Sequence, residues 1–364
     1  MGSDLNKIKT ADFIKPYKYI IFDLDGVITS EETYWNCAAL VIYEILSGSL
    51  WSLKNPNGYL SNKNIDYRRA EDSVCEIKDL IFNKGKIISE FKRYGVNSNW
   101  DLGYYTLLGC VINGAGGELT PEKNSSRDFF GGVYKFIANI GANDSYSFLA
   151  ELEKRAQRVI PMEEGFYKRY GVLWNYCYDL FQEWYFGRTE DSVQKMGFVN
   201  KERPLLPLDK LHELFGTLKK DGKILSVATG RLKDELKSLE NWGLLGYFGN
   251  IVTYTDCINA EKSLKNTVSL SKPHPYQFLK ALFAEDYTDG QIIAGEYNKE
   301  IMTRVLVIGD AASDLTAAKS IRAAFMGVLT GVLTRGDFEK QKADFICSNV
   351  LEVIYSRGGH WPSV

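Results

Sequence analysis

Two aspartates, separated by one residue, end the first apolar run of the chain. Tyr19–Phe22 is followed by Asp23 and Asp25, and Gly26 then marks a turn, in the segment FDLDGVIT. Two carboxylates this close repel each other unless positive charge lies beside them. The pair therefore predicts a site that uses negative charge, and the rest of the sequence must supply its other groups.

Two later segments contribute charges of both signs. In VLVIGDAASD, Asp310 ends an apolar run and Asp314 follows four residues later, while in LSKPHP a proline follows Lys272. Carboxylate oxygens suit a hard divalent ion, and with only three histidines in the chain Mg²⁺ is favoured over zinc. A lysine near such an ion can bring positive charge to a phosphate. These groups predict a phosphoryl site.

The segment SVATGR predicts an anion cradle. Thr229 and Gly230 end another apolar run, and Arg231 follows as a candidate substrate contact. A hydroxyl next to exposed backbone N–H groups at a helix start can hold an anion. Taken singly, each group also has a structural explanation, since Thr229 could cap a helix and Lys272 could be a solvated lysine. The four segments favour a site because all of them follow apolar runs or adjoin turns.

The elements that must position these groups alternate along the sequence. Short apolar runs typical of buried parallel strands span residues 19–22, 224–228, 251–254, 305–308, 324–329 and 344–347. Helical patterns lie between them, for example at 208–222 and 232–243. This alternation predicts an α/β, Rossmann-like, doubly wound parallel sheet. Such sheets bind ligands at the carboxyl ends of their strands, where the candidate residues fall.

One long segment interrupts the alternation. Residues 32–200 show helical and aromatic patterns but no strand–turn–helix repeat. Within VLWNYCYDLFQEWYF, aromatic residues share one helical face, which predicts a helix packed into a core of its own: Trp174, Tyr178, Phe181 and Tyr185. We therefore predict a core α/β domain in two pieces, 1–31 and 201–364, with a large, mostly α-helical domain inserted after the first strand.

Composition narrows the classes of protein. The chain of 364 residues is long enough for about two domains, and 45% apolar with 25% charged residues is ordinary for a soluble protein. A formal net charge of -2 creates no field that attracts nucleic acid or an anionic membrane. The six cysteines form no CxxC pair, and neither a secretory signal nor a transmembrane run is apparent. We expect a cytoplasmic protein without nucleic-acid or membrane partners; the sequence gives no oligomeric state.

Together the four segments resemble the haloacid dehalogenase-like (HAD) superfamily. FDLDGV, VATG, SKP and IGDAASD match, in order, the DxDG, Ser/Thr, Lys and GDxxxD motifs of that family. The insertion after the first motif is similar to the C1 cap of subfamily I, found in phosphoglycolate phosphatases and β-phosphoglucomutases, although it is longer than a usual cap. The resemblance implies an HAD-type phosphoric monoester hydrolase, a Mg²⁺-dependent phosphatase acting on a small phosphorylated metabolite through an aspartyl-phosphate.

The resemblance also implies a role for each residue. Asp23 would be the nucleophile, and Asp25 would donate and then accept the proton. Mg²⁺ would be held by Asp23, Asp310, Asp314 and the backbone carbonyl of Asp25. The substrate phosphate would be held by Gly26, Thr229, Gly230, Arg231 and Lys272, with Thr229 and Lys272 also serving catalysis. The alternatives are a phosphomutase of the same superfamily and a non-catalytic protein that binds a partner through its aromatic insertion.

Overall fold

The computed structural model describes residues 10–47, 66–96, 98–114, 124–142, 145–190, 193–264 and 269–355. The chain divides into two compact units, one comprising Met1–Ser30 and Arg203–Val364 and the other Glu31–Glu202. We call them the core unit and the inserted unit. That the inserted unit acts as a cap over the core stays a prediction.

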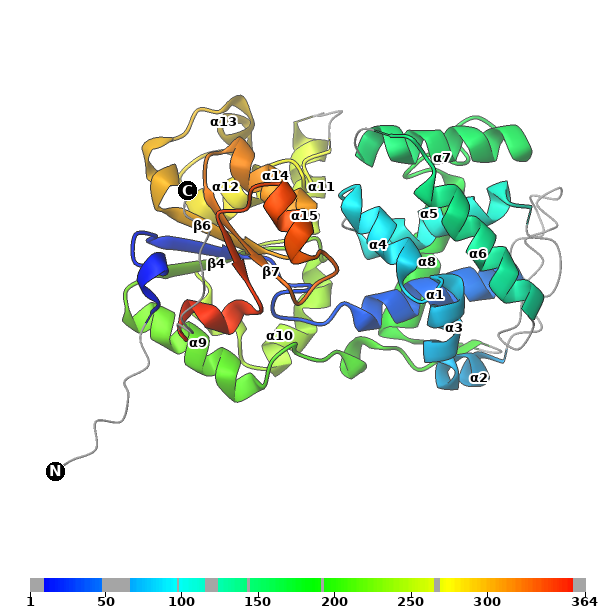
Figure 1. Ribbon diagram of the computed structural model, residues 1–364, viewed down its shortest axis with the longest axis horizontal. Coiled ribbons are helices and arrows are strands. Elements are labelled where there is room, and N and C mark those ends of the chain that lie inside the picture. Colours follow the sequence, from blue (N-terminus) through cyan, green and yellow to red (C-terminus); the bar gives the residue numbers. More distant parts are fainter. Residues whose placement is uncertain are drawn as a thin grey trace. The chain divides into compact units, whose positions relative to one another are not determined.

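A six-stranded parallel sheet runs through the core unit (Figure 1). Its strands are β1 (Tyr19–Phe22), β4 (Ile224–Ala228), β5 (Asn250–Val252), β6 (Val305–Gly309), β7 (Ala324–Val328) and β8 (Phe345–Cys347). They lie in the order β5-β4-β1-β6-β7-β8, so β1 pairs with β4 on one side and β6 on the other. The predicted α/β, Rossmann-like parallel sheet is confirmed.

Helices cover both faces of this sheet. They are α9 (Leu208–Lys220), α10 (Lys237–Asn241), α11 (Tyr254–Ser263), α12 (Tyr276–Phe283), α13 (Asp289–Ala294), α14 (Ala312–Ser320) and α15 (Arg335–Lys340). Helix α9 packs on one face, while α12 and α14 lie on the other (Figure 1). Phe22 meets Phe215 of α9 edge to face, with ring centroids 5.4 Å apart. Because strand side chains alternate, Asp23 belongs to the opposite face, toward α12 and α14.

Two elements differ in extent from the sequence prediction. The expected strand 251–254 ends at Val252 because Thr253 starts a helix instead. The carboxylate of Asp256 accepts hydrogen bonds from the backbone N–H and the hydroxyl of Thr253, both at 2.7 Å, which closes a capping box. The helix expected at 232–243 is divided into a 3₁₀ helix, Lys233–Leu236, followed by α10.

Among its described residues, the inserted unit consists of helices and one hairpin. Its elements are α1 (Glu32–Ser47), α2 (Tyr67–Asp72), α3 (Val74–Ile81), α4 (Lys86–Arg93), α5 (Asn99–Ile112), α6 (Asn124–Ala138), α7 (Ser145–Val159), α8 (Val172–Phe186), β2 (Arg188–Glu190) and β3 (Val193–Lys195). Helix α8 buries Trp174, Phe181 and Tyr185, and Tyr34 of α1 stacks on the last of these at 5.1 Å. The aromatic face thus packs within the unit's own core. None of the described helices combines the length and apolar character needed to cross a bilayer.

A buried lysine fixes the hairpin of the inserted unit to its helices. The ammonium group of Lys195 lies 2.9 Å from a carboxylate oxygen of Glu44 and 2.7 Å from one of Glu183, and none of its side chain is exposed. Trp184 donates its indole N–H to Glu44 at 2.9 Å. A buried cation needs such partners to offset the loss of its hydration.

The chain leaves and re-enters the core unit at neighbouring residues. Thr29 forms an isolated antiparallel bridge with Pro204, and the backbone N–H of Ser30 donates to the carbonyl of Arg203 at 3.0 Å. The two chain segments that flank the insertion are therefore joined by hydrogen bonds on the core side.

Candidate active site

The two central strands of the sheet place two carboxylates side by side. Asp23 directly follows β1, and Asp310 directly follows β6. Phe22 pairs with Ile308 in the register of these strands, and the backbone N–H of Asp23 continues the ladder by donating to the carbonyl of Ile308 at 2.9 Å. Both carboxylates are 2% exposed. The sheet thus brings them together, away from water, at its carboxyl edge.

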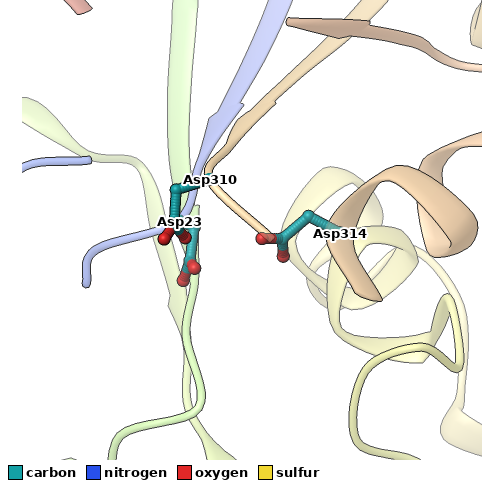
Figure 2. A group of neighbouring side chains, drawn as sticks. All are labelled: Asp23, Asp310 and Asp314. Atoms are coloured by element: carbon teal, nitrogen blue, oxygen red, sulfur yellow. The ribbon is translucent and has the colours of Figure 1, made fainter. Parts of the chain in front are cut away.

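A third carboxylate reaches this edge from the first turn of α14. Asp314 is completely buried, and one of its oxygens accepts a hydrogen bond from the backbone N–H of Ala311 at 3.3 Å. It therefore has the ordinary structural role of a residue in a capping box. Carboxylate oxygens of Asp23, Asp310 and Asp314 nevertheless all lie within 4.8 Å of one another. Figure 2 shows the Asp314 side chain directed toward the other two.

Lys272 supplies the positive charge beside these carboxylates. Its ammonium nitrogen is 2.9 Å from Asp23 Oδ1 and 2.8 Å from Asp314 Oδ1, and 1% of its side chain is exposed. Burial acts to lower the pKa of Lys272, but the two carboxylates outweigh it and raise that pKa above its usual value. Lys272 is therefore an ammonium ion held between Asp23 and Asp314.

The environment of Asp23 opposes its ionisation when no metal is bound. Burial raises the pKa of the Asp23 carboxyl to about 7, and the charge of Asp314 adds to this effect. The Lys272 ammonium acts in the opposite direction without cancelling it. With a pKa of about 7, the Asp23 carboxyl is mostly protonated below neutral pH, and further positive charge beside it would be needed to keep it ionised there.

The donor set fits a divalent cation. When all three carboxylates are ionised, they and the one ammonium leave two negative charges uncompensated, which a divalent ion would balance. Glycines hold the carboxylates closely: a Cβ on Gly26 would lie 2.3 Å from an oxygen of Asp310, and a Cβ on Gly331 would lie 1.9 Å from it. Hard oxygen ligands grouped in this way are those that Mg²⁺ and similar ions prefer.

Asp25 stands apart from the three-carboxylate group. Its Oδ1 accepts from the hydroxyl of Thr29 at 2.8 Å and from Nη2 of Arg231 at 2.7 Å. Nε of Arg231 also lies 3.1 Å from Asp25 Oδ2. Arg231, which the sequence suggested as a substrate contact, thus directs its guanidinium at the second aspartate of the first motif.

The predicted anion cradle lies at the end of β4. Thr229 is fully buried, and its hydroxyl accepts a hydrogen bond from the backbone N–H of Arg231 at 3.2 Å. Gly230 follows it, and the 3₁₀ helix begins only at Lys233, two residues later than Arg231. The phosphate-binding roles of Thr229 and Gly230 stay predictions.

Two polar side chains near the motifs were not apparent from the sequence. Gln277, on α12, is 1% exposed and donates from Nε2 to the carbonyl of Thr229 at 2.7 Å. Thr330, after β7, donates its hydroxyl to the carbonyl of Gly26 at 2.5 Å. Both join segments far apart in the sequence, so no local spacing signals them. Their position next to recognisable motifs, Gln277 after SKP and Thr330 before a glycine, is the only available clue.

Comparison with known proteins gives one family match, over part of the chain. A family model of HAD-hydrolase-like proteins matches residues 269–353, which include Lys272, Asp310 and Asp314. No curated protein sequence matches the chain. An X-ray structure of a structural-genomics target is 25% identical, with a TM-score of 0.63, and the match covers 92% of this chain and 97% of that chain.

More distant solved structures also match over most of the chain. A hydrolase from Pseudomonas syringae is 18% identical, with a TM-score of 0.40, 92% of this chain and 95% of that chain being covered. A HAD-superfamily hydrolase of subfamily IA from Geobacter sulfurreducens PCA is 15% identical, with a TM-score of 0.37 and coverage of 93% and 95%.

The family model match, the parallel sheet and the motif residues at its carboxyl edge point to the same class of protein. Residues 269–353 are similar to the HAD-hydrolase-like family, in agreement with the superfamily that the sequence motifs indicated. The matched family is one of hydrolases, the type of enzyme that the motifs also indicate.

Proposed function

We propose that the protein is a Mg²⁺-dependent phosphatase that hydrolyses a small phosphate ester through an aspartyl-phosphate. The observation that carries this proposal is the buried group of three carboxylates around the Lys272 ammonium. Such a group binds a cation and an anionic substrate together, and phosphoryl transfer depends mainly on positioning and on screening of charge. When bound, Mg²⁺ would be held by Asp23, Asp310, Asp314 and the backbone carbonyl of Asp25, and it would screen the phosphoryl oxygens.

The first half of the reaction transfers the phosphoryl group to the protein. A carboxylate oxygen of Asp23 forms a bond to phosphorus, and the bond between phosphorus and the ester oxygen breaks. Lys272, fixed 2.9 Å from Asp23, keeps the attacking oxygen in place and offers its charge to the phosphoryl oxygens. Asp25 gives a proton to the departing ester oxygen, which leaves as an alcohol.

The second half releases phosphate. Asp25, now a carboxylate, takes a proton from a water molecule whose oxygen attacks phosphorus. The bond between phosphorus and the Asp23 oxygen breaks, which regenerates the carboxylate and gives inorganic phosphate. The hydroxyl of Thr229 and the backbone N–H of Gly230 would hold phosphoryl oxygens in both halves.

Phosphate release from a panel of phosphate esters tests the proposal. Purified protein should release phosphate from at least one ester with Mg²⁺ and not with EDTA, and Asp23→Asn should abolish the release. Asp234→Asn, an exposed aspartate of the same unit, is the matched control and should keep full activity. No metal-dependent release from any ester, or release that survives Asp23→Asn, would overturn the proposal.

The same assay separates the phosphomutase alternative. A mutase would convert a hexose 1-phosphate to its isomer, given a trace of the bisphosphate, without net release of phosphate. Isomerisation without release would replace hydrolysis as the function while keeping Asp23 as the group that is phosphorylated.

A further inference from the structure

Arg231 is a buried cation that the proposed reaction does not yet use. Its residue is 1% exposed, among the largest fully buried side chains of the described chain. A buried guanidinium is costly unless its donors are satisfied, because it loses its hydration. The positions of its partners therefore show what the side chain is for.

One edge of the guanidinium is fixed by the core unit itself. Nη1 donates to the carbonyl of Glu235 at 3.1 Å and lies 3.5 Å from the hydroxyl of Ser238. The backbone of Arg231 is also held, since its carbonyl accepts from the N–H of Tyr254 at 2.8 Å. Arginine presents its donors in a rigid plane, so fixing one edge fixes the direction of the other.

The other edge points at Asp25. Nη2 is 2.7 Å from Oδ1, and Nε is 3.2 Å from Oδ1 and 3.1 Å from Oδ2. The hydroxyl of Thr29 donates to the same Oδ1 at 2.8 Å. Nη2, Nε and the Thr29 hydroxyl therefore all reach Oδ1, and Nε also reaches Oδ2, which fixes the plane of the carboxylate. The Asp25 side chain keeps 15% of its surface exposed, so one side of the carboxyl group stays accessible.

We infer that Arg231 is a positioning residue that holds Asp25 for proton transfer, in place of a contact with the substrate. The inference rests on the proposed function, in which Asp25 moves the proton. A proton donor acts only within hydrogen-bond reach of the atom that it protonates, and small errors of placement cost large factors in rate. The fixed guanidinium and the Thr29 hydroxyl together set that placement.

Leaving groups of different basicity test the inference, because an alkyl phosphate needs its departing oxygen protonated and a nitrophenyl phosphate needs it much less. In Arg231→Met, kcat for the alkyl ester should fall by about a hundredfold, the scale of a misplaced acid. For the nitrophenyl ester it should fall by less than about tenfold, and KM should hardly change for either. Arg231→Lys should restore part of the loss. Arg304→Lys, which changes an exposed arginine of the core unit, should leave kcat and KM unchanged for both esters.

A double variant shows whether Arg231 acts through Asp25. In an Asp25→Ala background, Arg231→Met should cost nothing further, because the group that it positions is gone. The inference would be overturned if Arg231→Met lowered kcat equally in both backgrounds or equally for both esters. It would also be overturned if KM rose with kcat unchanged, a result that would favour substrate binding.

A measurement independent of turnover distinguishes failure of the inference from failure of the proposed function. The Nε–H signal of Arg231 can be assigned in a ¹⁵N NMR spectrum of the wild type, because it is the arginine signal that disappears in Arg231→Lys. It should exchange slowly with water in the wild type and shift on Asp25→Asn. An unshifted, fast-exchanging signal overturns the ion pair, whereas a shifted signal in a protein without phosphatase activity sinks only the proposed function.

Discussion

Asp23 is expected to destabilise the metal-free fold at neutral and alkaline pH. Burial raises the pKa of this carboxyl from 3.8 to about 7. When the pKa of an acid is higher in the folded than in the unfolded protein, the folded state binds its proton more tightly. The resulting stabilisation is complete below about pH 4, the pKa of the unfolded chain, and is lost as the pH rises through about 7.

The size of the effect follows from the shift. About three pKa units at about 1.4 kcal/mol each give an upper bound of about 4 kcal/mol. Asp23→Asn has no charge to bury, so in EDTA its free energy of unfolding should exceed that of the wild type by up to this amount at pH 8. The free energies of unfolding of the wild type and the variant should converge toward pH 4. Saturating Mg²⁺ should stabilise the wild type more than the variant, because the cation binds the ionised carboxylate of the folded state.

Urea unfolding measures these differences in the free energy of unfolding. Circular dichroism follows the unfolding at several pH values between 5 and 8, with either EDTA or Mg²⁺ present. Asp234→Asn is again the control, because it changes an exposed aspartate of the core unit and should alter the free energy by little at any pH. A difference between Asp23→Asn and the wild type that does not change with pH would refute the reasoning. So would a variant less stable than the wild type at pH 8 in EDTA.

Three further results are expected. Mg²⁺ affinity measured by calorimetry should weaken as the pH falls below about 7, with proton release on binding, since the proton and the cation compete for one carboxyl group; affinity that is constant with pH would contradict this. Gly331→Ala should weaken Mg²⁺ binding at least tenfold by crowding Asp310, whereas Gly216→Ala, where the added methyl meets open space, should leave binding unchanged. Glu44→Gln should lower the free energy of unfolding by about 3 kcal/mol, and Glu190→Gln, at an exposed pair, by less than about 1 kcal/mol.

The sheet and the grouping of its charged residues could be predicted because both depend on local patterns. Apolar runs ending in polar residues indicate parallel strands, and the ends of such strands share one edge of the sheet. Asp23 and Asp310 therefore had to lie at the same edge of the sheet once both runs were strands, whereas their being neighbours follows from the strand order, which no local pattern gives. Their chemical roles stay predictions, since position alone does not assign the nucleophile.

The partner of Asp25 could not be predicted in the same way. Arg231 follows Thr229 and Gly230 in the sequence, where a contact with a bound anion is as plausible as an ion pair. Its direction is set by Glu235 and by the backbone of the following 3₁₀ helix, which the helical pattern did not separate from α10. Side-chain direction in a loop depends on contacts distant in sequence, and periodicity carries no information about them.

The inserted unit shows a further limit. Lys195 lies in a hairpin rich in charged residues, which by composition alone would be assigned to solvent. Its ammonium is buried because Glu44 and Glu183 come to it from two helices. Only the packing of those helices reveals that the hairpin is fixed through this lysine.

The hydrogen bonds at the insertion point affect how the core unit can fold. The bridge between Thr29 and Pro204 and the hydrogen bond between Ser30 and Arg203 close the inserted segment into a loop on the core unit. The entropy lost on closing a flexible loop grows only with the logarithm of its length. Lengthening or shortening the insertion thus changes the cost of assembling the core by a small amount. A deletion that joins the two flanking segments through a short linker would keep their register, which makes this junction a natural position for exchanging one inserted unit for another.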